Sequence, residues 1–286
     1  MKLNLYFVGG YVRDKILGIE SKDIDVVLVP KDDVNKEFEL AIEKFIKEGY
    51  ELVFKSQFFT AKFKKGDHIL DLAVSRKEIY EYNGALPKIE IVYSIYEDLK
   101  RRDFTINAIA MDFNGKIIDI LNGIEHLKRK ILIPINSLLD DPTRIFRGIR
   151  YAKKLNLKYS KKFLNQINSS KKFLKNVSFS RIKKELEIIS IEKNRIFIWQ
   201  DILKFKLFPN LEWNNLIFDI NKKIPLVESS WILFYITFLK YPINLVHITK
   251  LEREIIKLFE RRNIKKTLKN EIYDIAITIL KQRGMI

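Results

Sequence analysis

The chain has 286 residues, 47% of them hydrophobic, which predicts two or three units with buried cores and excludes wholesale disorder. Its 53 Lys and Arg residues outnumber 36 Asp and Glu residues, and the formal net charge of +17 favours a polyanionic partner such as nucleic acid or an anionic membrane, although a generally basic surface would give the same surplus. The absence of cysteine excludes disulfides, thiolate zinc sites and cysteine nucleophiles.

The first 125 residues alternate between strand and helix patterns, which indicates an α+β unit built on a mixed sheet with helices. Gly9 and Gly10 separate the first apolar strand from a short helix that ends at Gly18. The second strand is apolar on both faces after its two acids, so we expect it at the centre of the sheet. The predicted strands cover residues 3–8, 24–29, 59–63, 68–74 and 106–113, with turns at 65–67 and 114–115 and a helix over 34–48.

After about residue 125, Gly and Pro become rare and periods near 3.6 residues dominate, which predicts an all-helical part. We divide it into two parts, residues 126–190 and residues 191–286, which the family resemblance given below makes a helical neck and a shortened helical body. The predicted helices cover residues 141–154, 160–168, 180–191, 195–205, 229–239, 250–260 and 266–282.

The sequence contains no pattern that indicates a membrane protein. The apolar run at the N-terminus is too short for a signal peptide. The most apolar stretch, residues 231–239, is far shorter than the roughly 20 residues needed to span a bilayer. We therefore expect a cytoplasmic protein that does not bind a membrane.

Three acids indicate a metal site. Asp23 and Asp25 flank one residue at the start of a strand, so their carboxylates project from one face, and Asp71 is a lone charge in another apolar strand. The three histidines are too scattered to form a site, so carboxylates would hold any metal, which points to Mg²⁺. The alternative is structural: Asp23 ends a loop, Asp25 pairs with a lysine and Asp71 marks an edge strand.

The glycine pair predicts a phosphate site. Gly9 and Gly10 lie between a strand and a helix, where the backbone can approach a phosphate closely, and Arg13 lies one turn into that helix. The arginine offers a fork of donors, although it could instead pair with Asp14. The glycine pair followed by the two acids places a triphosphate cradle next to a metal site.

Ordered motifs over two-thirds of the chain resemble the signatures of the class II tRNA nucleotidyltransferases, a family that includes the CCA-adding enzymes and the bacterial poly(A) polymerases. The number of motifs and their order make chance agreement negligible. The matching segments are residues 7–14 (FVGGYVRD), 23–25 (DID), 98–108 (DLKRRDFTINA), 119–127 (DILNGIEHL), 140–147 (DDPTRIFR) and 178–186 (SFSRIKKEL).

The resemblance implies a nucleotidyltransferase head over residues 1–125, with Mg²⁺ as the cofactor and ATP and CTP as substrates. It makes Asp23 and Asp25 the metal ligands and Asp71 the third catalytic carboxylate. It places Gly10 and Arg13 at the phosphates of the nucleotide.

The later motifs imply nucleotide recognition. Arg102 and Asp103 would sense the ribose, and Asn107 would support the site. Asp141 and Arg144, on the neck, would form hydrogen bonds with the Watson–Crick edge of C or A and so replace a nucleic-acid template.

The residues around this last motif predict a helix independently of the resemblance. Asp141 and Pro142 form a good helix start, and Arg144, Arg147 and Arg150 then recur every three residues. The arginines could bind the base and the triphosphate, or simply form a solvated face with Asp141 as a cap. On the opposite side, Ile145, Ile149 and Ala152 are expected to pack inward.

Two departures from the family pattern concern this neck motif and the body. Asp140 stands where the family has Glu, and about 95 residues follow the last motif, fewer than the family's body and tail contain. The basic pairs Lys222-Lys223, Arg261-Arg262 and Lys265-Lys266 could reach tRNA phosphates or form a solvated basic face.

The resemblance implies an enzyme that adds C, A or both to the 3′ end of tRNA. Complete CCA addition, CC addition, A addition and poly(A) synthesis share these motifs, because the choice among them depends on a flexible loop, which we place within residues 80–97. A catalytically inactive RNA-binding relative and an unrelated membrane-surface protein are alternatives. An inactive relative is expected to have lost at least one of the three acids. An unrelated membrane-surface protein is expected to lack the ordered motifs.

Overall fold

A computed structural model describes residues 3–212, 217, 221–238, 248–261 and 271–283. The chain divides into two compact units, and we describe each by itself. The first, which we call the head unit, comprises Met1–Ser137 with Lys158–Phe163, and the second, the helical unit, comprises Leu138–Leu157 with Leu164–Ile286.

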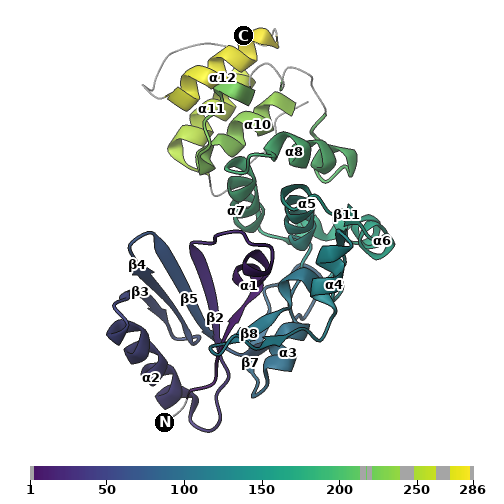
Figure 1. The fold of residues 1–286 in the computed structure, drawn as a ribbon. Helices are drawn as coiled ribbons and strands as arrows, with labels where there is room; N and C mark the ends of the chain where they lie inside the picture. Colours follow the sequence, from purple (N-terminus) through teal and green to yellow (C-terminus); the bar gives the residue numbers. More distant parts are fainter. Residues whose placement is uncertain (1–2, 213–216, 218–220, 239–247, 262–270, 284–286) are drawn as a thin grey trace. The chain divides into compact units, whose positions relative to one another are not determined.

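A seven-stranded mixed sheet forms the frame of the head unit, in the order β3-β4-β5-β2-β1-β8-β9 (Figure 1). Strands β2 and β5 pair in parallel, and the other neighbours in this sheet are antiparallel. The second strand is central, as predicted, because β5 and β1 flank it. The strands are β1 (Leu5–Val8), β2 (Asp23–Leu28), β3 (Glu51–Ser56), β4 (Thr60–Lys65), β5 (His68–Val74), β8 (Ala110–Asp112) and β9 (Ile117–Ile118).

Short elements surround this sheet. The hairpin of β6 (Arg76–Ile79) and β7 (Lys88–Ile91) is a separate two-stranded sheet, so residues 80–97 contain a strand and the start of a helix as well as a loop. The helices are α1 (Gly9–Ile16), α2 (Val34–Lys47), α3 (Ile95–Lys100) and α4 (Gly123–Lys128), with a 3₁₀ turn, η1 (Thr105–Asn107), and the parallel pair β10 (Ile131–Leu132) and β11 (Lys158–Tyr159).

Two apolar cores lie on opposite faces of the sheet. On one face, α2 packs Phe38, Ile42 and Phe45 against the buried side chains of β1, β2, β4 and β5. On the other, Ile95 and Leu99 of α3 pack against β1, β2 and β8. This second core includes no buried residue of β4 or β5, and these two strands bury only the side chains that face α2, so they have one covered face and one open face.

The helical unit has helical secondary structure throughout its described elements, which confirms the predicted change of architecture. The α10 helix is buried along its whole length, and Trp231 at its start donates to Glu252 at 2.7 Å. Glu252 also accepts from Lys183 at 2.7 Å and ties α7, α10 and α11 together. The elements are α5 (Arg144–Lys154), α6 (Lys161–Ser170), η2 (Lys171–Asn176), α7 (Phe179–Ser190), α8 (Arg195–Lys204), η3 (Asn221–Lys223), η4 (Glu228–Ser230), α10 (Trp231–Phe238), α11 (Lys250–Arg261) and α12 (Glu271–Gln282).

Most of the predicted elements agree with the structure to within a few residues, but the strand predicted over residues 106–113 is wrong in its first half. Residues 105–107 form the η1 turn, and only Ala110–Asp112 pair as a strand. The side chain of Asn107 bonds to Arg13 and Asp103, and these bonds hold the backbone in a turn. The turn at Asn114-Gly115 is confirmed.

Some sequence predictions fall on residues outside the described part of the chain. The basic residues Arg262, Lys265 and Lys266 lie there, as do residues 266–270 of the last predicted helix. Lys222 is exposed on η3. Within the described residues, no helix is both long enough and apolar enough to cross a membrane.

Candidate active site

The carboxylates predicted to hold a metal lie at the junction of β2 and β5. Asp25 stands directly opposite Asp71 in the parallel register, and Asp23 lies two residues earlier on the same face of β2. Strand β5 lies between β4 and β2, so the alternative that Asp71 marks an edge strand is wrong. Lys62 of β4 forms an ion pair with Asp71 at 2.9 Å.

Gly9 brings the backbone against this group. Its φ of +70° belongs to the left-handed region, and a Cβ atom there would lie 3.1 Å from Asp25 Oδ2 and 3.0 Å from Arg102 Nη1. Carboxylate oxygens are the ligands that Mg²⁺ prefers, so the donor set fits this metal. No group of three or more acidic or histidine side chains is gathered in metal-binding geometry within the described residues.

Arg13 lies folded against its own helix. Its Nη1 donates to Asn107 Oδ1 at 2.6 Å and its Nε to Asp14 Oδ1 at 2.7 Å, so the pairing with Asp14 that the sequence allowed is present. Asn107 Nδ2 in turn donates to Asp103 Oδ1 at 3.0 Å. All four side chains are buried. Three predicted site residues, Arg13, Asp103 and Asn107, thus form one hydrogen-bonded chain next to Gly10, where an added Cβ would lie 3.4 Å from Arg13 Nη2.

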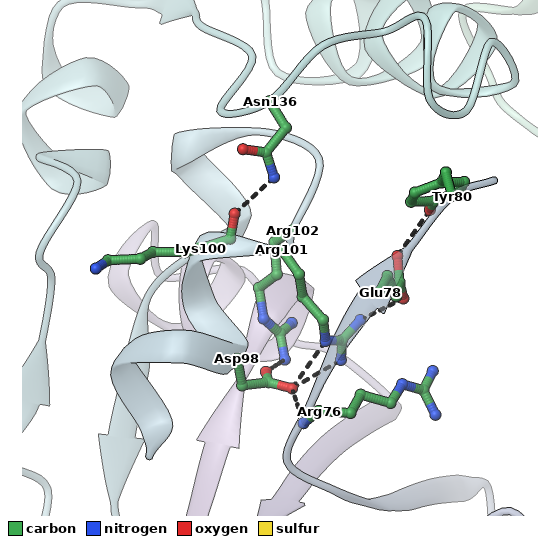
Figure 2. A network of polar contacts seen from close by, with 8 residues as sticks. All are labelled: Arg76, Glu78, Tyr80, Asp98, Lys100, Arg101, Arg102 and Asn136. Carbon is green, nitrogen blue, oxygen red and sulfur yellow. Dashed lines mark hydrogen bonds and ion pairs between the residues drawn. The ribbon is translucent and has the colours of Figure 1, made fainter. Parts of the chain in front are cut away.

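A residue without a predicted role, Asp98, lies at the centre of the ionic network in Figure 2. Its carboxylate is fully buried and accepts from Arg101 Nε and Arg102 Nη2, each at 2.9 Å, and from the backbone N–H of Arg76 at 3.3 Å. Arg101 also bonds to Glu78 at 2.8 Å, so α3 is tied to the β6–β7 hairpin. Asp98 and Arg102 are four residues apart, a spacing that could have indicated this contact, although α3 ends at Lys100 before it reaches Arg102.

The segment with the pattern D-x-x-x-G, residues 119–123, packs against η1. Asp119 accepts from the backbone N–H of Gly123 at 2.7 Å and of Ile124 at 2.9 Å. A Cβ on Gly123 would lie only 2.2 Å from the carbonyl oxygen of Thr105, so α4 can approach η1 only through a glycine. This packing fixes the turn that carries Asn107.

The residues proposed to choose the base lie in the helical unit. Asp141 accepts from the backbone N–H of Thr143 at 3.0 Å and from its hydroxyl at 2.6 Å, and it pairs with Arg181 at 2.9 Å. The helix begins at Arg144, three residues later than predicted, after a turn that starts at Asp141. Burial raises the pKa of the neighbouring Asp140, an effect that the positive charge of Arg144 opposes.

The arginines of α5 do not form a simple solvated face. Arg144 is buried, whereas Arg147 and Arg150 are half-buried. Arg150 lies 3.6 Å from Glu192. On the other side of the helix, the inward packing predicted for its apolar residues is confirmed, since Ile145, Ile149 and Ala152 are all buried.

We expect Gly9→Ala to lower catalytic turnover by about tenfold to a hundredfold, because the new methyl group displaces the Asp25 carboxylate and the Arg102 guanidinium. Gly18→Ala is the matched control: its φ is +68°, but nothing lies within 4 Å of its Cβ position. Both variants carry the same backbone strain, so their difference in turnover isolates the contact with the site. Equal turnover in the two variants would show that the close approach at Gly9 has no functional role.

Parts of the chain are similar to known proteins. Residues 5–133 match the family model described as the poly A polymerase head domain. Over 226 residues, 74% of this chain and 26% of the relative, the chain is 35% identical to an A-adding tRNA nucleotidyltransferase of Aquifex aeolicus (strain VF5). Over 187 residues, 64% of this chain and 45% of the relative, it is 33% identical to a CCA-adding enzyme of Lactococcus lactis subsp. cremoris (strain MG1363).

The fold has solved counterparts as well. An apo structure of a CCA-adding enzyme matches 98% of this chain and 78% of its own, with a TM-score of 0.75 and 24% identity. The chain thus shares its fold with this CCA-adding enzyme. Residues 5–133 thus form a poly A polymerase head domain, and the matched part of the chain spans 26% and 45% of the length of the two curated relatives named above.

Proposed function

We propose that this protein adds C, A or both to the 3′ end of tRNA, using CTP and ATP and releasing pyrophosphate. One observation carries the proposal: the register of β2 and β5 places Asp25 opposite Asp71, with Asp23 on the same face and Gly9 against Asp25. The relatives named as A-adding and CCA-adding enzymes support tRNA as the substrate.

The residues of the head unit divide the work of phosphoryl transfer. Asp23 and Asp25 would hold Mg²⁺, with Asp71 as the third carboxylate. When bound, the metal supplies Lewis-acid activation of the 3′ hydroxyl and neutralises charge on the leaving pyrophosphate. The backbone at Gly10 admits the triphosphate closely, and Arg13 offers its guanidinium to the phosphates.

The remaining residues select the nucleotide. Arg102 and Asp103 contact the ribose, and Asn107 holds Asp103 and Arg13 in place through the two hydrogen bonds described above. Asp141 and Arg144 provide an acceptor and a donor for the Watson–Crick edge of the base, while Arg147 and Arg150 contribute positive charge toward the triphosphate.

The decisive experiment supplies the purified protein with three tRNA transcripts, ending before CCA, after C and after CC, together with ATP, CTP or both. Sequencing of the products then separates the activities that the family contains. Addition of a single A to the CC-ending transcript alone would match the relatives named as A-adding enzymes. A long A tract would indicate a poly(A) polymerase, and no addition to any transcript would contradict the proposal.

Arg144→Ala is expected to reduce the preference for the correct nucleotide by about tenfold or more, since a well-placed bidentate contact to a base contributes about 1–3 kcal/mol of discrimination. The measurement is kcat/KM for ATP, CTP, GTP and UTP. Arg147→Ala, on the same helix, should instead raise KM for all four nucleotides alike. Because Arg144 is buried, thermal unfolding of each variant is measured in parallel, and unchanged selectivity in a folded Arg144→Ala protein would refute its role.

A further inference from the structure

The open face of the sheet beside the carboxylates has a defined composition. Along β4 and β5 every second side chain is buried against α2, and the alternate ones are exposed or half-exposed. On β4 this second set comprises the half-buried Thr60 and Lys62 and the exposed Lys64, and Phe54 on the edge strand β3 has 57% of its surface exposed. We call Phe54, Lys62 and Lys64 the open-face platform.

The strand register sets the order of these side chains. Phe54 pairs with Lys62, Lys62 with Asp71, and Asp71 with Asp25, so four residues form one row across four strands. Neighbouring strands lie about 4.8 Å apart, which places Phe54 roughly 14 Å from Asp25. The next row leads from Glu51 through Lys64 and Ile69 to Asp23.

The chemistry of the platform suits single-stranded nucleic acid. An exposed aromatic ring stacks on any base, and lysines beside it bind the phosphates, without a requirement for sequence. Lys62 already pairs with Asp71, and Lys64 makes no ion pair within the described residues. Two acids lie near Lys64: Glu51 stands opposite it at the outer edge, and Asp67 on the adjoining β4–β5 turn interacts with it electrostatically.

We infer that the open-face platform binds the last unpaired nucleotides at the 3′ end of the RNA substrate. The RNA would run along the row, with its terminal hydroxyl at Asp25 and Asp71, its phosphates over Lys62 and Lys64, and an upstream base on Phe54. The inference rests on the proposed function for its choice of RNA, and it assigns residues that the nucleotide site does not use.

The test measures binding without any nucleotide, using two transcripts of one tRNA: one ending in CC and one trimmed to a blunt acceptor stem. The wild-type protein is expected to bind the CC-ending transcript more tightly. Phe54→Ala should reduce this preference by about tenfold, and Phe54→Tyr should restore it, as expected for base stacking. Lys64→Ala should lower the salt dependence of binding by about 0.7 in the log–log slope, the value for one phosphate contact on a single strand.

Lys55→Ala is the matched control, because Lys55 lies on the same strand but faces α2, where it pairs with Glu39. It should keep the wild-type preference. Equal binding of the two transcripts by the wild-type protein, or an unchanged preference in Phe54→Ala and Lys64→Ala, would overturn the inference. Binding is measured without nucleotide, so this result does not depend on the addition assay. A failure of the addition assay would count against the proposed function alone.

Discussion

Asp25→Ala is expected to lower nucleotide addition by roughly a thousandfold or more while tRNA binding is kept. Two structural observations concern Asp25. It stands opposite Asp71 in the strand register, and the backbone of Gly9 lies against its carboxylate. A metal held there contributes several kcal/mol to the transition state, and each 1.36 kcal/mol is about a factor of ten in rate. Asp23→Ala should have the same effect.

The measurement combines single-turnover addition with tRNA binding by filter retention. Asp67→Ala is the control, because Asp67 is an exposed acid on the neighbouring β4–β5 turn that pairs with Lys22. The unfolding temperature of each variant is measured in parallel to establish that the protein is folded. A folded Asp25→Ala protein with retained turnover would refute the metal assignment.

Asp98→Ala is expected to destabilise the head unit by about 3–5 kcal/mol, because it leaves the guanidinium groups of Arg101 and Arg102 buried without their shared anion. Urea unfolding measures the loss. Glu97→Ala is the matched control, since Glu97 is the exposed neighbour in the first turn of α3. A loss no larger than that of the control would show that the buried network contributes little to stability.

The same network predicts a dependence on pH. Burial alone would raise the pKa of Asp98, but the charges and hydrogen bonds of Arg102 and Arg101 outweigh it and hold this pKa below its usual value. A carboxylate with a lowered pKa in the folded state stabilises the protein above the unfolded value of about 3.9, and the contribution is lost as pH falls through the folded value. Stability of the wild-type protein should therefore fall below about pH 4 more steeply than that of Asp98→Ala.

Much of the head could be predicted from the sequence because its signals are local. The spacing of Asp23 and Asp25 fixes their common face, and the lone charge of Asp71 in an apolar strand indicated the third member of the proposed site, which the strand register places opposite Asp25. The apolar character of the second strand predicted its central place, and that place put β5 within reach. The resemblance supplied the order of the motifs and the roles.

The rest depends on contacts between segments far apart in the chain. The η1 turn follows from the bonds of Asn107 to Arg13 and Asp103, which no local pattern of residues 106–113 contains. The pair of Lys62 with Asp71 and the close approach of Gly123 to Thr105 likewise arise only once the strands and helices pack. The spacing of Asp98 and Arg102 could have indicated their contact, but nothing local in the sequence predicted that Asp98 is buried among arginines.

Asp71 helps to fix the register of β5 against β2 in their parallel pairing. Side chains alternate along a strand, so a shift of β5 by one residue would turn Asp71 from the open face into the apolar core beneath α2. It would also bring Leu70 or Leu72 opposite Asp25. A carboxylate buried there without a partner costs several kcal/mol, which disfavours the shifted sheet. Asp71, which the proposed chemistry requires, therefore also disfavours alternative registers of β5 in the sheet.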